Sequence, residues 1–486
     1  MKKNTKNNSR RIDPDPIPVS FDMDSASASN SDPDSGSTSS YEEVLLSSMR
    51  IMNSVTKKKS SVAKPSVSNT ITPTLVNKIS VSSSSSQITK STGAPHTFSS
   101  PDGRPTESRV EFIKHILDGN KLQPMIDFDN HVIDHEYDRL NKKTMDVRKL
   151  FDSMNVTLKY IKSGTTGHTF KATSTLNKDI AFAVKVCAYP KTDDYGGIKN
   201  PKRPENAELR MLKLLSSFVL RMKTPHFILP IGTFNTSIGP FINIPKKLID
   251  LSDEKNESYR KFIERCEEGE FEDLVSVLIS EWANGGDLLD YIRKNYKSMT
   301  LKQWIIIIFQ ILYTLASLHK KYEAFRHNDM KANNILVRLT KSTYAEKLYS
   351  YKMDHIKFQI PDIGIQIKIW DFDFACIDGI IENNKVNSDW TTKMNVSKKK
   401  NQYYDMHYFF NTLICERFFP QFYTGGAPKE IIEFVHRIIP EKFRTIVANK
   451  YIRKGGRILV DYEFTTPYKV IMEDKLFDNY RFIDRN

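Results

Sequence analysis

The sequence predicts an α+β fold in which a small β-rich part is followed by a larger, mainly helical part. In the first part, Tyr160–Phe170 has the pattern of two strands joined by a turn, and Ala181–Val186 is a short apolar strand. A Gly-Gly break at Gly285 ends the last strand and leads into a helix. The stretch Trp304–Leu318 is apolar but too short to span a bilayer, and it contains Gln310, so it predicts a buried helix.

The turn between the first two strands contains two glycines. Gly164 and Gly167 would let backbone N–H groups approach a phosphate, although a plain hairpin turn fits the same residues. The next strand carries Lys185, and a lysine in a strand core is costly unless a carboxylate pairs with it. Glu208, on the following amphipathic helix, is the best partner, and Glu205 is the alternative.

Two short strings in the second part hold the groups that phosphoryl transfer needs. Residues 324–335 read Ala-Phe-Arg-His-Asn-Asp-Met-Lys-Ala-Asn-Asn-Ile and supply Asp329, Lys331 and Asn334. A second string, Ile-Lys-Ile-Trp-Asp-Phe-Asp-Phe, places Asp371 directly after an apolar β-rich run. One carboxylate can receive the hydroxyl of a substrate, a cation can offset the charge of the moving phosphate, and two oxygen ligands can hold Mg²⁺.

These strings resemble the catalytic loop and the magnesium loop of protein kinases. With the glycine turn, the lysine strand and the strand before the Gly-Gly break, they follow the order of the eukaryotic-type protein kinase superfamily, over about residues 155 to 480. Three positions depart from that family: Lys162 replaces the first glycine of the loop, Asn328 replaces the arginine of His-Arg-Asp, and Asp373 replaces the glycine of Asp-Phe-Gly. No Ala-Pro-Glu occurs in the expected stretch. This divergence, the serine-rich head and the lysine- and asparagine-rich composition are similar to kinases of large DNA viruses, such as the poxvirus virion kinase.

The resemblance implies a two-lobed protein kinase-like fold in four parts. These are a disordered serine-rich tail (1–105), a helical N-terminal extension (106–154), a small ATP-binding lobe (155–284) and a large catalytic lobe (285–486). The tail holds too little apolar surface to offset its chain entropy. Two charged insertions, at about 237–270 and 340–360, interrupt the kinase plan and are expected to form solvated hairpins or helices.

The resemblance also implies the role of each catalytic residue. Asp329 would align the substrate hydroxyl and take its proton, and Lys331 would neutralise the γ-phosphate. Asn334 and Asp371 would hold Mg²⁺. Asp405, at the start of a later helix, would brace the catalytic loop.

A second set of residues would bind ATP. Lys185 would grip the α- and β-phosphates, with Glu208 orienting it, and Asp287 would reach the ribose. Backbone groups near Glu281 and Ala283 would bond the adenine edge, which places Ser280 at the back of the pocket, next to the adenine amino group. The nucleotide-binding set is Gly164, Gly167, Ala183, Lys185, Glu208, Glu281, Ala283 and Asp287.

Composition narrows the choice of partners and compartment. Lys and Arg exceed Asp and Glu by 72 to 58, and the net charge of +14 favours acidic partners, acidic protein substrates among them. The charge is spread without a basic stripe interleaved with aromatic residues, so the sequence gives no argument for nucleic acid. Four scattered cysteines predict reduced thiols in a cytosol-like compartment, which is the host cytoplasm or the virion if the protein is viral. No signal peptide or transmembrane segment is expected, and nothing indicates an oligomeric state.

The function predicted from these residues is a protein kinase that is dependent on ATP and Mg²⁺, with serine/threonine specificity favoured by Lys331. The segment Lys398–Lys400 falls where related folds line the peptide groove, which suggests a preference for acidic targets. Two alternatives remain. A pseudokinase scaffold is favoured by the three departures, but every charged group of the chemistry is present. A small-molecule or lipid kinase shares part of the catalytic string but lacks the equivalent of Lys331.

Overall fold

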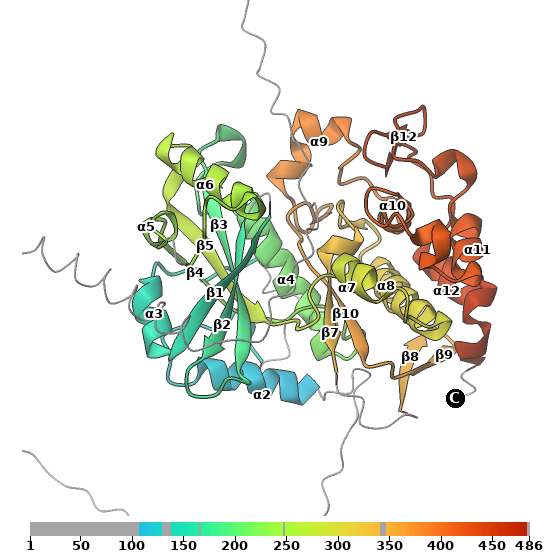
Figure 1. The fold of residues 1–486 in the computed structure, drawn as a ribbon, viewed down its shortest axis with the longest axis horizontal. Helices are drawn as coiled ribbons and strands as arrows, with labels where there is room; N and C mark the ends of the chain where they lie inside the picture. Colours follow the sequence, from blue (N-terminus) through green and yellow to red (C-terminus); the bar gives the residue numbers. More distant parts are fainter. Residues whose placement is uncertain (1–105, 129–137, 165–166, 246–247, 341–346, 484–486) are drawn as a thin grey trace, which may run out of the picture.

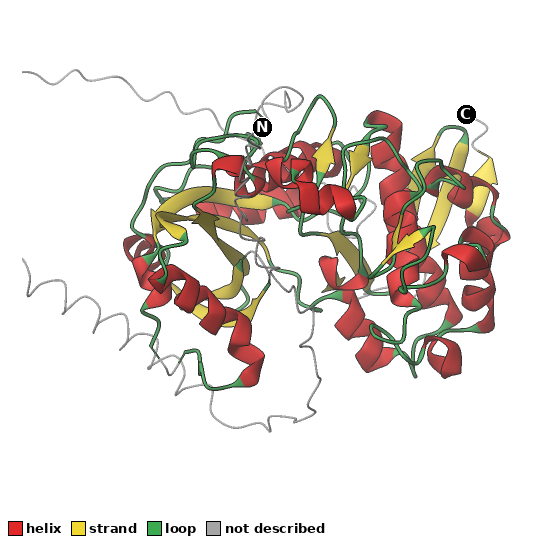
Figure 2. Ribbon diagram, turned by 90° about the horizontal axis from the view of Figure 1, so that it is seen from above, coloured by secondary structure: helices red, strands yellow, loops and turns green. Residues whose placement is uncertain are grey.

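The fold consists of two lobes that lie side by side, one rich in strands and one mainly helical (Figures 1 and 2). This architecture confirms the predicted α+β, two-lobed fold class. The tail predicted for residues 1–105 lies outside the described residues. The computed structural model describes residues 106–128, 138–164, 167–245, 248–340 and 347–483.

A five-stranded antiparallel sheet, in the order β1-β2-β3-β5-β4, forms the small lobe. Lys185 lies opposite Leu278, and Ala183 lies opposite Ser280. Opposite residues in an antiparallel pair project from the same face, so these four side chains share the face on which the long helix α4 packs. The elements are β1 (Val156–Ser163), β2 (His168–Ser174), β3 (Ala181–Pro190), β4 (Pro230–Ser237), β5 (Phe271–Glu281), α4 (Pro204–Leu220) and the short turn η1 (Asp193–Tyr195).

In the described residues of the N-terminal extension, helix occurs at the two ends, as α2 (Thr106–Leu117) and α3 (Val147–Ser153). The described chain between them runs beside the edge strand β4, where Pro124 forms a bridge with Gly232 and Thr144 with Asn235. The approach at Gly232 is close, because a Cβ there would lie 2.7 Å from a carbon of Leu122. The described residues between α2 and α3 therefore lie along the free edge of β4 instead of forming a helix.

The first insertion covers the outer face of the small-lobe sheet. It forms α5 (Gly239–Ile242), η2 (Glu254–Asn256) and α6 (Glu257–Glu267). Two buried side chains of α6, Tyr259 and Phe262, contact the ring of His168 on β2, at centroid distances of 4.5 and 4.3 Å. The insertion is thus helical, as expected, but one side of it is packed instead of solvated, because these two aromatic residues lie on one face of the helix.

The large lobe is built around α8 (Leu301–Lys321), whose N-terminus is closed by a capping box between Thr300 and Gln303. Of the described helices, only α8 is long and apolar enough to cross a membrane, and most of that stretch is buried inside the lobe. It is the buried helix that the sequence predicts. The other described helices and helical turns of this lobe are α7 (Leu288–Asn295), η3 (Ala332–Asn334), η4 (Asn384–Asn387), α9 (Asp389–Lys393), α10 (Tyr404–Leu413), η5 (Phe422–Gly426), α11 (Lys429–Ile438), η6 (Glu441–Phe443), α12 (Pro467–Glu473) and η7 (Lys475–Tyr480).

The second insertion forms a hairpin of β8 (Leu348–Met353) and β9 (Ile356–Pro361), and the C-terminal strand β14 (Arg481–Ile483) pairs with β9. The buried side chains of the β8–β9 hairpin pack on α8. The ring of Tyr351 lies 4.8 Å from that of Tyr313, and the ring of Phe358 lies 5.1 Å from that of Phe309. The alternation of buried and exposed residues along β8 explains why a composition rich in lysine and tyrosine still forms a packed hairpin.

Short strand pairs bring the two catalytic strings together. Strand β7 (Ile335–Leu339) pairs with β10 (Ile365–Ile369), and Ile335 lies opposite Ile369. The residues just before β7 and just after β10 are therefore neighbours, which brings Asn334 close to Asp371. Two further pairs join β6 (Phe325–Arg326) to β11 (Cys376–Ile377) and β12 (Ile452–Arg453) to β13 (Arg457–Ile458).

Candidate active site

Lys185 lies at the centre of a buried group of charges. Its ammonium is 2.7 Å from a carboxylate oxygen of Glu208 on α4 and 2.9 Å from one of Asp371 after β10. Glu205, the alternative partner, pairs with Arg203 instead, at 2.9 Å. The lysine therefore joins the sheet, α4 and the second catalytic string.

Lys185 and Asp371 hold each other in their ionised forms, whereas burial raises the pKa of Glu208 to about 7 despite the nearby lysine. Burial alone would lower the pKa of Lys185, but the carboxylates of Asp371 and Glu208 raise it well above its usual value. Burial and the nearby charge of Asp329 would raise the pKa of Asp371. The charge and hydrogen bond of Lys185 outweigh both, so the pKa of Asp371 is lowered. A cation and an anion are thus fixed near each other, where phosphate and metal would meet.

The glycine turn lies at the end of β1. Gly164 donates its N–H to the carbonyl of Gly167 at 2.8 Å. A Cβ at Gly167 would lie 2.7 Å from the sulfur of Cys187 and 2.9 Å from the carbonyl of Val186, so only glycine fits there. Residues 165 and 166 lie outside the described residues.

Lys162 precedes this turn, at the position where the family has a glycine. Its ammonium pairs with Asp287 at 2.9 Å, and the same aspartate caps α7 by accepting the N–H of Asp290 at 3.0 Å. The residue expected to reach the ribose is therefore already bound by two groups of the protein.

The predicted hinge follows β5. The backbone N–H of Glu281 bonds the carbonyl of Leu229 at 3.1 Å, and Ala283 is buried. The side chain of Glu281 takes no part in this backbone bond. Its two carboxylate oxygens accept hydrogen bonds from the guanidinium of Arg109 on α2, at 2.9 and 2.6 Å. Burial would raise the pKa of Glu281, but Arg109 lowers it.

The catalytic loop gathers Asp329, Lys331 and Asn334 as the sequence predicts. One carboxylate oxygen of Asp329, Oδ2, is 2.8 Å from the amide nitrogen of Asn334 and 3.3 Å from the ammonium of Lys331. The loop is braced by Asp405, which accepts the backbone N–H groups of His327 and Asn328 at 2.7 and 2.9 Å. These bonds fix the loop to α10.

Two residues of the site have left-handed backbones, Asn328 (φ +64°) and Asp371 (φ +63°). Asparagine and aspartate tolerate this conformation better than most side chains do. The positive φ values therefore agree with the residue types at both positions.

The residues present fit a magnesium ion. The amide nitrogen of Asn334 is committed to Asp329, which leaves its oxygen for a metal. Asp371 uses one carboxylate oxygen on Lys185, and the other remains for a ligand. One amide and one carboxylate oxygen are the hard donors that Mg²⁺ takes when the phosphates of a nucleotide and water complete its shell.

The segment after Asp371 is held to the catalytic loop by Asn328. Its amide donates to the carbonyls of Phe374 and Ser397 at 3.0 and 3.1 Å, and its oxygen accepts the N–H of Ser397 at 3.3 Å. Arg326 adds bonds to the hydroxyl of Ser397 at 2.9 Å and to the carbonyl of Asn395 at 2.7 Å. These bonds connect both ends of the segment to one loop.

Asp373, the other departure from the family, pairs within the same segment with the buried Lys385. The ammonium of Lys385 also lies 4.1 Å from the ring centroid of Phe374. Asn383 donates to the backbone carbonyl of Asp373 at 2.8 Å. Asp373 therefore links the start of this segment to residues 383 and 385 in the same segment.

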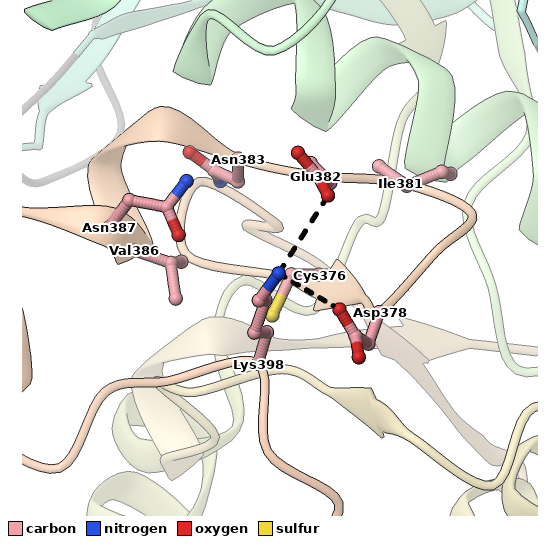
Figure 3. Close-up of a pocket in the computed structure, with 8 residues that line it drawn as sticks. All are labelled: Cys376, Asp378, Ile381, Glu382, Asn383, Val386, Asn387 and Lys398. Carbon is pink, nitrogen blue, oxygen red and sulfur yellow. Dashed lines mark ion pairs between the residues drawn. The ribbon is translucent and has the colours of Figure 1, made fainter.

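Lys398 lies beside a small pocket next to Cys376 (Figure 3). It points toward two acids of the segment, Asp378 at 3.1 Å and Glu382 at 3.8 Å. Lys400 pairs with Glu323 at 2.8 Å. Two of the three lysines proposed to face acidic targets are thus paired within the chain.

Two functional candidates escaped the sequence analysis, Arg109 behind the hinge and Arg457 on the catalytic aspartate. Arg457 donates to Asp329 Oδ1 at 2.5 Å. Both arginines contact residues more than a hundred positions away, so no local spacing marks them. Burial of Asp329 would raise its pKa, but Lys331 and Arg457 lower it far below its ordinary value. A turn signal, Gly455-Gly456, was the only local hint of the hairpin that carries Arg457.

Fold and site together define a class, because a lysine–glutamate pair under a glycine turn and a braced Asp-Lys-Asn loop in a two-lobed α+β fold are the architecture of a protein kinase. Comparison with known proteins gives the family. A model described as "Poxvirus serine/threonine protein kinase" matches residues 287–469. A protein of Acanthamoeba polyphaga mimivirus named as a "putative serine/threonine-protein kinase" is 64% identical over 389 residues, which are 79% of this chain and 83% of that relative.

Two more distant relatives match shorter regions. A second mimivirus protein with the same kind of name is 26% identical over 35% of this chain and 45% of its own length. A "probable serine/threonine-protein kinase" of Dictyostelium discoideum is 33% identical over 21% of this chain and 8% of its own length. The chain belongs to the viral serine/threonine protein kinase family, which confirms the resemblance inferred from its motifs.

Proposed function

We propose that the protein transfers the γ-phosphate of ATP to serine or threonine hydroxyls of protein substrates, with Mg²⁺ bound between Asn334 and Asp371. The observation that carries this proposal is the pair of adjoining charge clusters, one around Lys185 and one around Asp329. The first matches what the phosphates and the metal need, and the second matches what the hydroxyl needs. The family to which the chain belongs supports the serine/threonine assignment.

In the proposed reaction, Asp329 orients the substrate hydroxyl for an in-line attack. The hydroxyl oxygen forms a bond to the γ-phosphorus while the bond from that phosphorus to the bridging oxygen of ATP breaks. The electron pair of the broken bond remains on the new terminal oxygen of ADP, and the hydroxyl proton passes to Asp329. Lys331 offsets the charge of the moving group, and Lys185 holds the other phosphates. Bound Mg²⁺ supplies further positive charge to the phosphate oxygens.

The test replaces the two acids one at a time. Asp329→Asn should lower the turnover of a protein substrate by about a hundredfold or more, because the hydroxyl loses its acceptor. Asp371→Asn should have a similar effect through the lost metal ligand. Asp152→Asn, an exposed change on α3, is the matched control. Wild-type phosphorylation by both active-site variants would show that the assigned mechanism is wrong.

The same assay separates the alternatives. A pseudokinase would bind nucleotide without transferring radiolabelled phosphate to any acceptor. A small-molecule or lipid kinase would label such acceptors and leave both an acidic and a basic protein substrate unlabelled. Preference between the two protein substrates also tests the proposed bias toward acidic targets. That bias now rests mainly on Lys399 and the net charge, because Lys398 and Lys400 pair internally.

We further infer that the protein acts in the host cytoplasm or in the virion. The viral relative and the free cysteines of the described chain, which are Cys187, Cys266, Cys376 and Cys415, support this compartment.

A further inference from the structure

Arg457 of β13 reaches the catalytic aspartate from a part of the large lobe that follows α11. Its side chain is buried, with 4% of its surface exposed, and donates to Asp329 Oδ1 at 2.5 Å. The other terminal nitrogen of the guanidinium donates to the backbone carbonyl of Asn328. The arginine therefore grips the catalytic residue and the residue before it at the same time.

Two residues of helix α10 also hold the guanidinium in place. The ring of Tyr408 lies 4.3 Å from the guanidinium carbon, and the hydroxyl of Tyr404 accepts a bond at 3.1 Å. The hairpin itself is tied to α10, because Asn411 donates to the carbonyl of Gly456 at 2.9 Å. Arg457 is thus held by its own hairpin and by two aromatic residues one helical turn apart.

The hydrogen bonds leave one part of Asp329 open. An ionised carboxylate has about four acceptor positions, two on each oxygen. Asn334 and Lys331 occupy Oδ2, and Arg457 occupies one position on Oδ1. The remaining acceptor position therefore lies on Oδ1, and its direction is set by the arginine.

We propose that Arg457 is a positioning residue that locks the Asp329 carboxylate so that one lone pair of Oδ1 faces the substrate hydroxyl. This inference rests on the proposed kinase function. It adds a contact between the catalytic loop and the β12–β13 hairpin to the mechanism. The arginine does not touch the substrate. It acts through the rotamer of Asp329 and leaves the nucleotide site around Lys185 unchanged.

The test compares three variants in the full-length protein. Arg457→Ala should lower kcat for a protein substrate by about a hundredfold, because a misplaced acceptor costs that much, while KM for ATP stays within about twofold. Arg457→Lys should restore part of the rate, because its ammonium can still reach Asp329. Millimolar guanidinium should also raise the kcat of Arg457→Ala by filling the vacated site. The matched control is Arg453→Ala, an exposed arginine directly opposite Arg457 in the hairpin.

Thermal unfolding and a crystal structure of Arg457→Ala complete the design. A variant that still unfolds in one cooperative transition, at a lower temperature because Asp329 loses a buried partner, and in which Asp329 is turned away from its wild-type rotamer, supports the proposal. Wild-type kcat in Arg457→Ala, or a faster rate, overturns it, as does an unmoved Asp329. An inactive wild-type protein with a moved Asp329 would refute the proposed function and leave the positioning role standing.

Discussion

Ser280 lies on the same sheet face as Ala183 and Lys185, the face proposed to receive the nucleotide. It is directly opposite Ala183 on the neighbouring strand, and its side chain is 1% exposed. Most kinases of the superfamily have a larger side chain at this position. In the proposed nucleotide site, a serine therefore leaves more room behind the adenine amino group than a larger side chain would.

We expect the protein to use ATP analogues that carry a bulky group on the adenine amine. Ser280→Phe should fill that room and lower the ratio of kcat/KM for the analogue to kcat/KM for ATP by about tenfold or more, through steric overlap. The measurement is the pair of ratios for the two proteins. Equal rejection of the analogue by wild type and Ser280→Phe would mean that the hinge is aligned incorrectly.

Among the elements, the segment between Asp371 and α10 carries the clearest consequence. In many kinases, the arginine beside the catalytic acid is neutralised by a phosphate added to this segment. Here Asn328 bonds the segment directly, and Asp373 pairs with Lys385 inside it. An uncharged amide and an internal ion pair supply the order that a phosphate supplies elsewhere.

We therefore expect the protein to be active when produced in bacteria and treated with phosphatase. Intact-mass measurement should confirm that no phosphate remains, and turnover should stay within about twofold of the untreated sample. Asn328→Ala should lower turnover, because three hydrogen bonds to the segment are lost, each worth about 1 kcal/mol. Loss of activity on phosphatase treatment, with recovery on re-phosphorylation, would contradict this expectation.

Helix α2, part of the N-terminal extension, also contacts the proposed nucleotide site through Glu281. Arg109 is 1% exposed, and besides Glu281 it bonds the carbonyl of Phe227 at 2.8 Å. Glu281 also accepts the backbone N–H of Leu229 at 2.8 Å. The helix therefore fixes the hinge from behind through one bidentate ion pair.

Arg109→Ala should destabilise the protein by about 3–5 kcal/mol, because it leaves Glu281 buried without its main partner, and it should raise KM for ATP. Lys114→Ala, an exposed change on the same helix, is the control for altered helix charge. Denaturant unfolding and ATP titration provide the two readouts. An unchanged KM for ATP would show that the ion pair is structural only.

For the whole molecule, the described fold begins at α2, which gives truncations a sharp boundary. Removing residues 1–105 should leave phosphorylation within a few-fold, because no candidate site residue lies there. Removing residues 1–120 should fail, because α2 and with it the buried ion pair between Arg109 and Glu281 are lost. A shorter protein that is folded and inactive at the first boundary would place part of the active site in the tail.

The sequence could predict those parts of the molecule in which the interacting residues lie within one short motif. The Asp-Lys-Asn loop spans six residues, and the apolar run before Asp371 is itself a strand, so local spacing was enough. Glu208 was chosen over Glu205 from the helical pattern of its neighbours alone. The fold class followed from the order of these motifs.

Long-range contacts account for what the sequence could not predict. Arg109 and Arg457 look like ordinary surface arginines until the chain folds and places each against a carboxylate. Tyr259 and Phe262 are two aromatic residues in a charged insertion, and their burial depends on the sheet below. In each case the stabilising contact is with a residue more than ninety positions away in the sequence.

The ion pair between Lys162 and Asp287 connects a strand of one lobe to the first turn of a helix in the other. A ribose that bonds Asp287 must compete with this lysine when ATP arrives, and the lysine can return when ADP departs. More than half of the lysine side chain is exposed (55%), so dissolved ions screen the attraction. Salt should therefore act on the exchange of nucleotides more than on the transfer step, and where ADP release limits turnover, moderate salt should speed the whole cycle.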